Sequence, residues 1–190
     1  MATAAAAALN PELAQIRQEL EQATEQTRKF VESCDDQAWA RKPSAKGWSA
    51  AECVIHLNKT SETALPLLRK GIAAARAQNR VTNEPYRLDF IGRQVLKFTE
   101  PPYRLRAPSP ASYNPTAVEP RAAVLARFEQ LQSELIDLLQ SADGLDLCQI
   151  KVAWAVYVRI RYNMFASFKI LPAHQRRHLW QAEQAAKISN

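Results

Sequence analysis

The sequence predicts an all-α protein, a four-helix bundle, and three observations lead to this fold class. Only four of the 190 residues are glycine, while alanine, leucine, glutamine and glutamate are abundant, a balance that favours long helices. Apolar residues recur at spacings of three and four, the period of an amphipathic helix. The length and the 47% of hydrophobic residues suit one core. We therefore expect a single domain over residues 1–190, with residues 1–9 as a frayed tail.

The first helix is predicted to begin at Pro11, with Asn10 as its N-cap, because asparagine is favoured at that cap and proline at the first helical position. Its apolar stripe consists of Leu13, Ile16, Leu20, Ala23, Thr27, Phe30 and Cys34. Such a stripe predicts a helix with one buried face. Residues 35–48 are predicted to be a connection that contains Trp39, Pro43 and Gly47.

The second helix is predicted to begin after Ser49, which forms a capping box with Glu52, while Trp48 packs against its first turn. Its main stripe consists of Val54, Leu57, Ser61, Ala64, Leu65, Leu68, Ile72 and Ala75. Pro66 lies inside this helix and is expected to kink or break it. A short helix is predicted after Pro85.

Six prolines between Pro101 and Pro120 predict a long extended crossover between the second and third main helices. The third helix is predicted to begin near Pro120 and to end at Gly144. Its stripe consists of Val124, Phe128, Leu131, Leu135 and Leu138.

Large apolar residues occupy every second position from 150 to 160, which is the period of a strand: Ile150, Val152, Trp154, Val156, Val158 and Ile160. A lone strand in a bundle has no obvious partner. Two interpretations stay open: pairing with residues 103–106, or a short extended segment leading into the last helix.

The last helix is predicted over about residues 161–187, with a kink at Pro172. Its stripe consists of Met164, Ser167, Leu171, His174, His178, Gln181 and Ala185.

The chain has three histidines, His56, His174 and His178. His174 and His178 are four residues apart, so on a helix both imidazoles lie on one face, with Cβ atoms about 6 Å apart. Both fall on the apolar stripe, where a buried imidazole needs a hydrogen-bond partner or a metal. His56 lies off the main stripe of its helix, so it can join the pair only if that helix has two buried faces. The alternative is three ordinary solvated or hydrogen-bonded histidines.

Three histidine ligands without a fourth protein ligand describe an open metal site, as in catalytic centres. Zinc and nickel both suit imidazole, and the sequence does not choose between them. Gln181, one turn after His178, is a candidate to orient the site, and Glu52 is a candidate second-sphere acceptor or general base. Because Gln175 follows the first histidine of the pair, the motif is not H-E-x-x-H, and a metalloprotease is excluded.

Other side chains have both a functional and a structural interpretation. Cys53 precedes His56 by three residues at a helix start, where a thiolate nucleophile is favoured, but a free cysteine is more often a buried core residue. Arg176 and Arg177 are expected to point to solvent, or to meet an anionic substrate. Three tryptophans either line a pocket or pack in the core, namely Trp48, Trp154 and Trp180.

Composition excludes several classes of protein. The net charge of +6 is spread along the chain without a run of five basic residues, so we expect a solvated basic surface and no nucleic-acid partner. No run of 18 apolar residues or signal peptide is present, so we expect no membrane partner. Three scattered cysteines without a C-x-x-C motif predict a reducing compartment.

Two segments resemble the DinB/YfiT-like superfamily. Residues 39–57, WARKPSAKGWSAAECVIHL, are similar to the family's proline, its G-x-W-S-x-x-E turn and the following H-L. Residues 173–181, AHQRRHLWQ, are similar to its C-terminal H-x-x-x-H-x-x-Q. The two motifs occur in the family's order and at its separation.

The resemblance implies a four-helix bundle that binds nickel or zinc through His56, His174 and His178, often as a homodimer in the cytoplasm. Relatives include thiol-dependent S-transferases, a thiol-dependent isomerase and metal-dependent hydrolases. The first hypothesis is therefore a metal-dependent enzyme that activates a low-molecular-weight thiol or water against a small electrophilic molecule. The second is a non-catalytic, stress-related dimeric bundle that binds metal or a ligand, and the third is a basic nucleic-acid binder.

Overall fold

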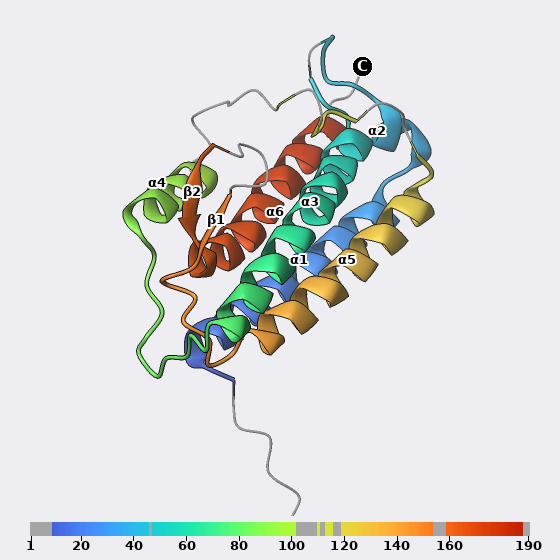
Figure 1. Ribbon diagram of the computed structural model, residues 1–190. Coiled ribbons are helices and arrows are strands. Elements are labelled where there is room, and N and C mark those ends of the chain that lie inside the picture. Colours follow the sequence, from blue (N-terminus) through green and yellow to red (C-terminus); the bar gives the residue numbers. More distant parts are fainter. Residues whose placement is uncertain are drawn as a thin grey trace, which may run out of the picture.

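Four long helices form the body of the protein in a computed structural model: α1 (Pro11–Ser33), α3 (Ala50–Ala77), α5 (Arg121–Ser141) and α6 (Met164–Ala186). The structure describes residues 9–45, 47–101, 110, 113–115, 119–153 and 159–187. Helices α1 and α3 each pack against both α5 and α6, so α5 and α6 face each other across a diagonal of the bundle (Figure 1). The predicted all-α bundle is confirmed.

Shorter elements surround this bundle. Helix α2 (Asp36–Ala40) lies at the end of the bundle where α3 begins, within the predicted connection of residues 35–48 (Figure 1). Helix α4 (Phe90–Thr99) is the short helix predicted after Pro85, and it packs on α6. None of the described helices is both long and apolar enough to span a membrane.

The starts of the long helices follow the predicted capping. The Asn10 side chain accepts a hydrogen bond from the backbone N–H of Glu12 at 3.0 Å. Ser49 Oγ accepts from the N–H of Glu52 at 3.2 Å, and the Glu52 carboxylate accepts from the N–H of Ser49 at 2.8 Å. This reciprocal capping box satisfies two otherwise unpaired donors, so the beginning of α3 is fixed locally.

Replacing Ser49 with alanine is expected to lower the free energy of unfolding by about 1 kcal/mol, because the buried N–H of Glu52 loses its acceptor. Urea denaturation measures the change. Ser141→Ala is the matched control, since the exposed Ser141 hydroxyl only donates to the carbonyl of Leu138 at a helix end. Equal stability of the two variants would contradict the capping role.

Proline does not end either helix that contains it. Of the kink or break expected at Pro66, the break does not occur, because α3 continues to Ala77, and α6 likewise continues through Pro172. Pro66 is exposed, so water can replace the backbone hydrogen bond that proline cannot donate. Its neighbours Leu65 and Leu68 are buried and hold the helix in place by tertiary packing.

Strand β1 (Lys151–Ala153) pairs antiparallel with β2 (Arg161–Asn163), with Val152 opposite Tyr162. The alternating segment therefore pairs with its own continuation, and β2 is an extended segment that leads directly into α6, as the second interpretation expected. Residues 103–106 and 154–158, including Trp154, lie outside the described residues.

Two helix boundaries and one buried position differ from the expected ones. Helix α5 ends at Ser141 and not at the predicted Gly144. The last helix begins at Met164 instead of residue 161, because Asn163 caps it by accepting from the N–H of Ala166. On α5, Leu139 is fully buried where Leu138 was expected, since the stripe shifts by one residue in the last turn.

The buried core is divided along the bundle axis. One apolar cluster includes Leu20 and Leu171 together with residues of the hairpin, and a second includes Val31 and Leu57 near α2. Buried polar side chains lie between the two clusters and are called the polar layer here: Thr27, Asn58, Thr60, Ser61, Gln132 and Gln175. Burying a polar group without a hydrogen-bond partner is costly, so the side chains of the polar layer need specific partners, unlike the apolar residues on either side of it.

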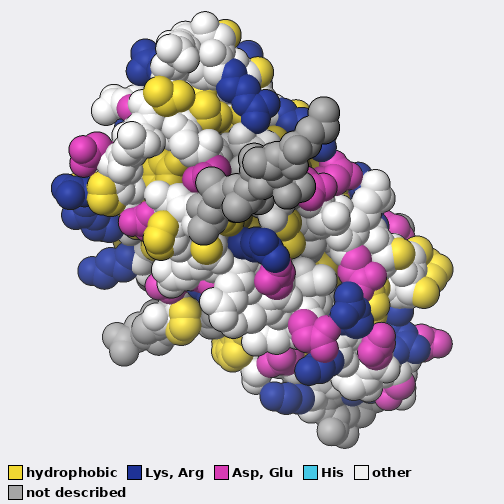
Figure 2. Space-filling model, turned by 90° about the horizontal axis from the view of Figure 1, so that it is seen from below, with side chains coloured by type: hydrophobic (Ala, Val, Ile, Leu, Met, Phe, Trp, Pro, Cys, Tyr) yellow, Lys and Arg dark blue, Asp and Glu magenta, His cyan; other side chains and the backbone are white. Residues whose placement is uncertain are grey.

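The surface carries mixed charge. On the face drawn in Figure 2, basic and acidic side chains lie side by side instead of forming a basic patch. Ion pairs such as Arg69 with Glu134 at 2.7 Å and Arg127 with Glu62 at 2.8 Å join neighbouring helices. On that face, the charge pattern is that of a solvated surface.

Candidate metal centre

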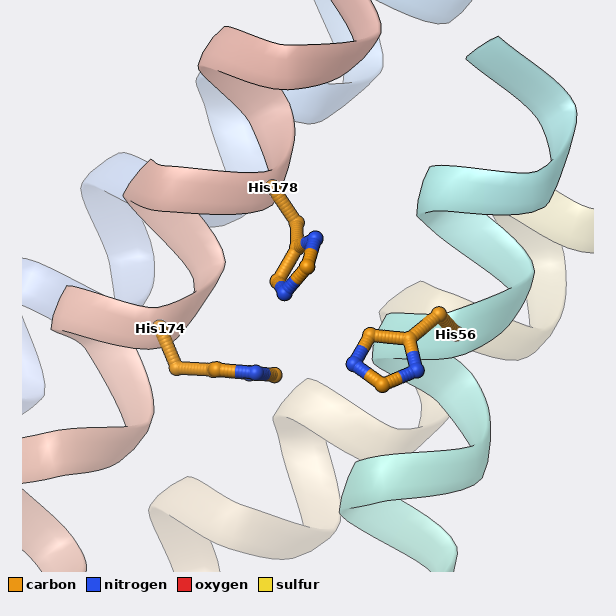
Figure 3. A group of neighbouring side chains, drawn as sticks. All are labelled: His56, His174 and His178. Carbon is orange, nitrogen blue, oxygen red and sulfur yellow. The ribbon is translucent and has the colours of Figure 1, made fainter. Parts of the chain in front are cut away.

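The three histidines meet between α3 and α6, with their rings directed toward one another (Figure 3). Each offers one ring nitrogen, and these nitrogens all lie within 4.8 Å of one another. The ring centroids of His178 lie 4.5 Å from those of both His56 and His174, and His56 and His174 are 5.3 Å apart. The structure thus brings together the predicted ligand set, at the level of the polar layer.

Local geometry explains how two helices supply this site. His174 and His178 are one turn apart on α6, so both side chains lie on one face. His56 joins them because residues 50–58 of α3 are buried on every side of the helix. The second buried face that the sequence required for His56 is therefore present.

One nitrogen of His56 is already held by the crossover. His56 Nδ1 lies 3.2 Å from the backbone carbonyl oxygen of Tyr113. A carbonyl only accepts, so Nδ1 carries the proton, and Nε2 keeps a free lone pair. This arrangement is typical of metal-binding histidines, whose second nitrogen donates to a carbonyl or carboxylate.

All three imidazoles favour the neutral form. Burial lowers the pKa of His56 to about 4. Burial, with the charge of His56 adding to it, lowers the pKa of His174 to about 3, and that of His178 also lies well below its usual value. His56 is buried, whereas His174 and His178 are half-buried. Neutral imidazoles are the form that binds metal, so at pH 7 the ligands need not lose a proton.

His178 has an unsatisfied atom. Its Nδ1 is buried and has no hydrogen-bond partner among the described residues. Gln181 is close enough to raise the pKa of His178 slightly, but it makes no hydrogen bond of ordinary geometry to Nδ1. A buried polar atom without a partner costs about 1–3 kcal/mol, so an additional ligand fits the donor set. The predicted orienting role of Gln181 stays a prediction.

Glu52 is engaged elsewhere. One carboxylate oxygen accepts from the N–H of Ser49 in the capping box, and the other pairs with Lys42 Nζ at 2.8 Å. These contacts position the start of α3 one turn before His56. They give no support to a role as general base, which stays a prediction.

The structure also shows where Cys53 and the tryptophans Trp48 and Trp180 lie relative to the histidines. Cys53 is fully buried, and burial with the nearby charge of Glu52 raises the pKa of its thiol to about 12, which favours the core interpretation. The Trp48 ring lies 4.8 Å from that of His56 and 5.8 Å from that of His178, so it covers the site. Trp180 is 45% exposed.

The expectation that Arg176 and Arg177 point to solvent is wrong. Arg176 pairs with Glu19 of α1 and with Glu100, each at 3.1 Å. Arg177 donates to the backbone carbonyl of Phe98 at 2.8 Å. Both arginines therefore attach the histidine-bearing turn of α6 to neighbouring elements, because acceptors on those elements lie within reach of long side chains.

A small cavity lies beside His174. Its walls are mostly apolar side chains of α3 and α6. The volume that the centre of a water molecule can occupy inside it is about 20 Å³, so the cavity has room for about one water molecule. The hydroxyl groups of Tyr162 and Ser167 interact with each other in its lining.

The sequence offered no signal for Tyr113 or Tyr162 at the site. Nothing in the proline-rich stretch distinguishes the one residue whose carbonyl faces His56. Tyr162 precedes α6 on a strand whose partner was not recognised. Both contacts depend on how distant segments pack, and neither follows from local periodicity.

Four packed helices with three neutral imidazoles facing one another between two of them define a class: helical-bundle proteins with a three-histidine site that could hold a divalent ion. The family model of the DinB superfamily matches residues 19–182, a stretch that includes all three histidines, and the chain belongs to this superfamily. Comparisons with curated proteins and with solved structures found no match in either set.

Proposed function

We propose that this chain is a metal-dependent enzyme in which His56, His174 and His178 hold one divalent ion, zinc or nickel. The reaction would be the transfer of a low-molecular-weight thiol to a small electrophilic substrate, or the hydrolysis of such a substrate. The observation that carries this proposal is the group of three ligand nitrogens within 4.8 Å, to which the described chain adds no carboxylate or thiol. Three protein ligands leave room for an exchangeable one.

When bound, a divalent ion supplies Lewis acidity, which lowers the pKa of a water or thiol in its open position and polarises a substrate oxygen. The residues of the chain prepare for this role. The Tyr113 carbonyl holds the His56 ring in the tautomer that leaves Nε2 free. Trp48 packs against His56 and His178 and limits the access of water from its side.

The surroundings of His174 suit one small group of a substrate, although not a whole substrate molecule. The adjacent cavity is mostly apolar and admits only a small group, while the hydroxyls of Tyr162 and Ser167 offer hydrogen bonds within it.

We further propose a cytoplasmic location and a homodimer. Free Cys34, Cys53 and Cys148 fit a reducing compartment.

A second candidate is a non-catalytic bundle that binds metal or a ligand in a stress response. The small volume of the cavity favours it, because a site with room for one water could serve binding without turnover. The two candidates differ in whether an external molecule can reach the ion.

Elemental analysis of protein purified without added metal tests the first part of the proposal, and about one divalent ion per chain is expected. The cobalt(II) form, titrated with a small alkyl thiol, tests the open position. A new thiolate-to-cobalt absorption band is expected for the enzyme. Absence of any bound ion contradicts the proposal, whereas bound ion without a thiol band favours the second candidate.

A further inference from the structure

The turn of α6 that carries His174 and His178 is attached to three neighbouring elements by the residues between the histidines. Arg176 and Arg177 reach α1 and the end of α4 from half-buried positions, where ion pairs contribute little. Gln175 instead points into the bundle and is only 2% exposed. In that low-dielectric setting its hydrogen bonds are strong and directional.

Gln175 forms a reciprocal amide pair with Gln132 of α5. Gln175 Nε2 donates to Gln132 Oε1 at 2.6 Å, and Gln132 Nε2 donates back to Gln175 Oε1 at 3.2 Å. Gln132 Nε2 also contacts the Leu20 carbonyl and Thr24 Oγ1 of α1, each at 3.0 Å. The pair therefore spans the diagonal between α5 and α6 and connects both helices to α1.

The other histidine helix is also attached to α5. Asn58, two residues after His56, donates from Nδ2 to the carbonyl oxygen of Val124 at 3.0 Å in a buried contact. Its Oδ1 is buried and has no partner among the described residues. Helix α5 carries no histidine, yet it makes a buried amide contact with each helix that does.

We propose that Gln132, Gln175 and Asn58 are positioning residues that set the rotation and depth of α6 and α3 against α5, and thereby the geometry of the three histidines. This inference rests on the proposed metal site. Apolar side chains in the flanking clusters tolerate small rotations of a helix, because their contacts have no preferred direction. A functional site requires its groups to be held within about 0.5 Å and 10–20°, a precision that directional amide contacts can supply.

The test separates positioning from stability. In the double variant Gln132→Leu with Gln175→Leu, both amides are removed together, and Thr24 Oγ1 still donates to the Leu20 carbonyl at 2.9 Å, so no buried partner is left unpaired. Asn58→Leu removes an atom that is already unsatisfied. Both variants are expected to unfold at the same urea concentration as the wild type or a higher one.

Their zinc affinity, measured by competition with a chelating dye, is expected to fall about tenfold. The visible spectrum of the cobalt(II) forms is expected to change as well. Leu135→Met, at an equally buried position of α5, is the control and should bind zinc as the wild type does. Unchanged zinc affinity in the two variants, or an equal loss in Leu135→Met, would overturn the positioning role alone. If the wild type bound no zinc, the proposed function would fail as well.

Discussion

Replacing His178 with alanine is expected to abolish stoichiometric binding of a divalent ion, from about one ion per chain to none. His178 has the central position in the cluster, since its ring centroid is 4.5 Å from those of both other histidines. Its loss leaves two imidazoles, too few for stable binding at an open site. His56→Ala is expected to have the same effect, although His56 comes from the other helix.

Elemental analysis and a zinc competition assay measure this loss. Gln184→Ala is the matched control, because Gln184 is exposed on the same helix and should leave metal content unchanged. Circular dichroism shows whether each variant keeps its helices. If His56→Ala or His178→Ala, folded, bound as much metal as the wild type, the three-histidine site would be wrong.

The metal-free protein is expected to lose stability steeply as the pH falls from about 6.5 to about 4. The folded state lowers the pKa of His56 from 6.5 to about 4, so in this range the unfolded chain binds more protons than the folded one. Stability is therefore fully present above the unfolded pKa and is lost as the pH falls toward the folded pKa. For His56 alone the loss amounts to about 3 kcal/mol, or about 10 °C in Tm for a chain of this size.

His174 and His178 act in the same direction, because burial lowers the pKa of each. Thermal unfolding of the metal-free protein at a series of pH values measures the effect. His56→Gln removes one titrating group, so its Tm should fall less over this range than that of the wild type. Asp89 does not account for such a difference. Burial acts to raise the pKa of its carboxyl, but Lys151 and two backbone N–H groups outweigh this effect and lower the pKa below its ordinary value. Parallel pH profiles of the two proteins would contradict the burial of a neutral His56.

The helices could be predicted because their signals are local. Asn10 and Ser49 form the expected caps, and the stripe of α1 is buried largely as its spacing indicated. A kink or a break was expected at Pro66, and the break does not occur, because a local rule about proline does not include the packing of Leu65 and Leu68 around it. The partner of β1 was missed because residues 161–163 were assigned to the last helix, which left no second strand nearby in the sequence.

At the candidate metal site, too, some features could be predicted from the sequence and others depend on the tertiary structure. The sequence by itself determined that His174 and His178 share one face, because a spacing of four residues on a helix leaves no other arrangement. Only the tertiary structure decided that His56 faces them, that Tyr113 holds its second nitrogen and that Gln132 meets Gln175 across the bundle. Periodicity specifies the faces of one helix, whereas the rotation and depth of helices relative to one another follow from packing among residues more than 40 positions apart in the chain.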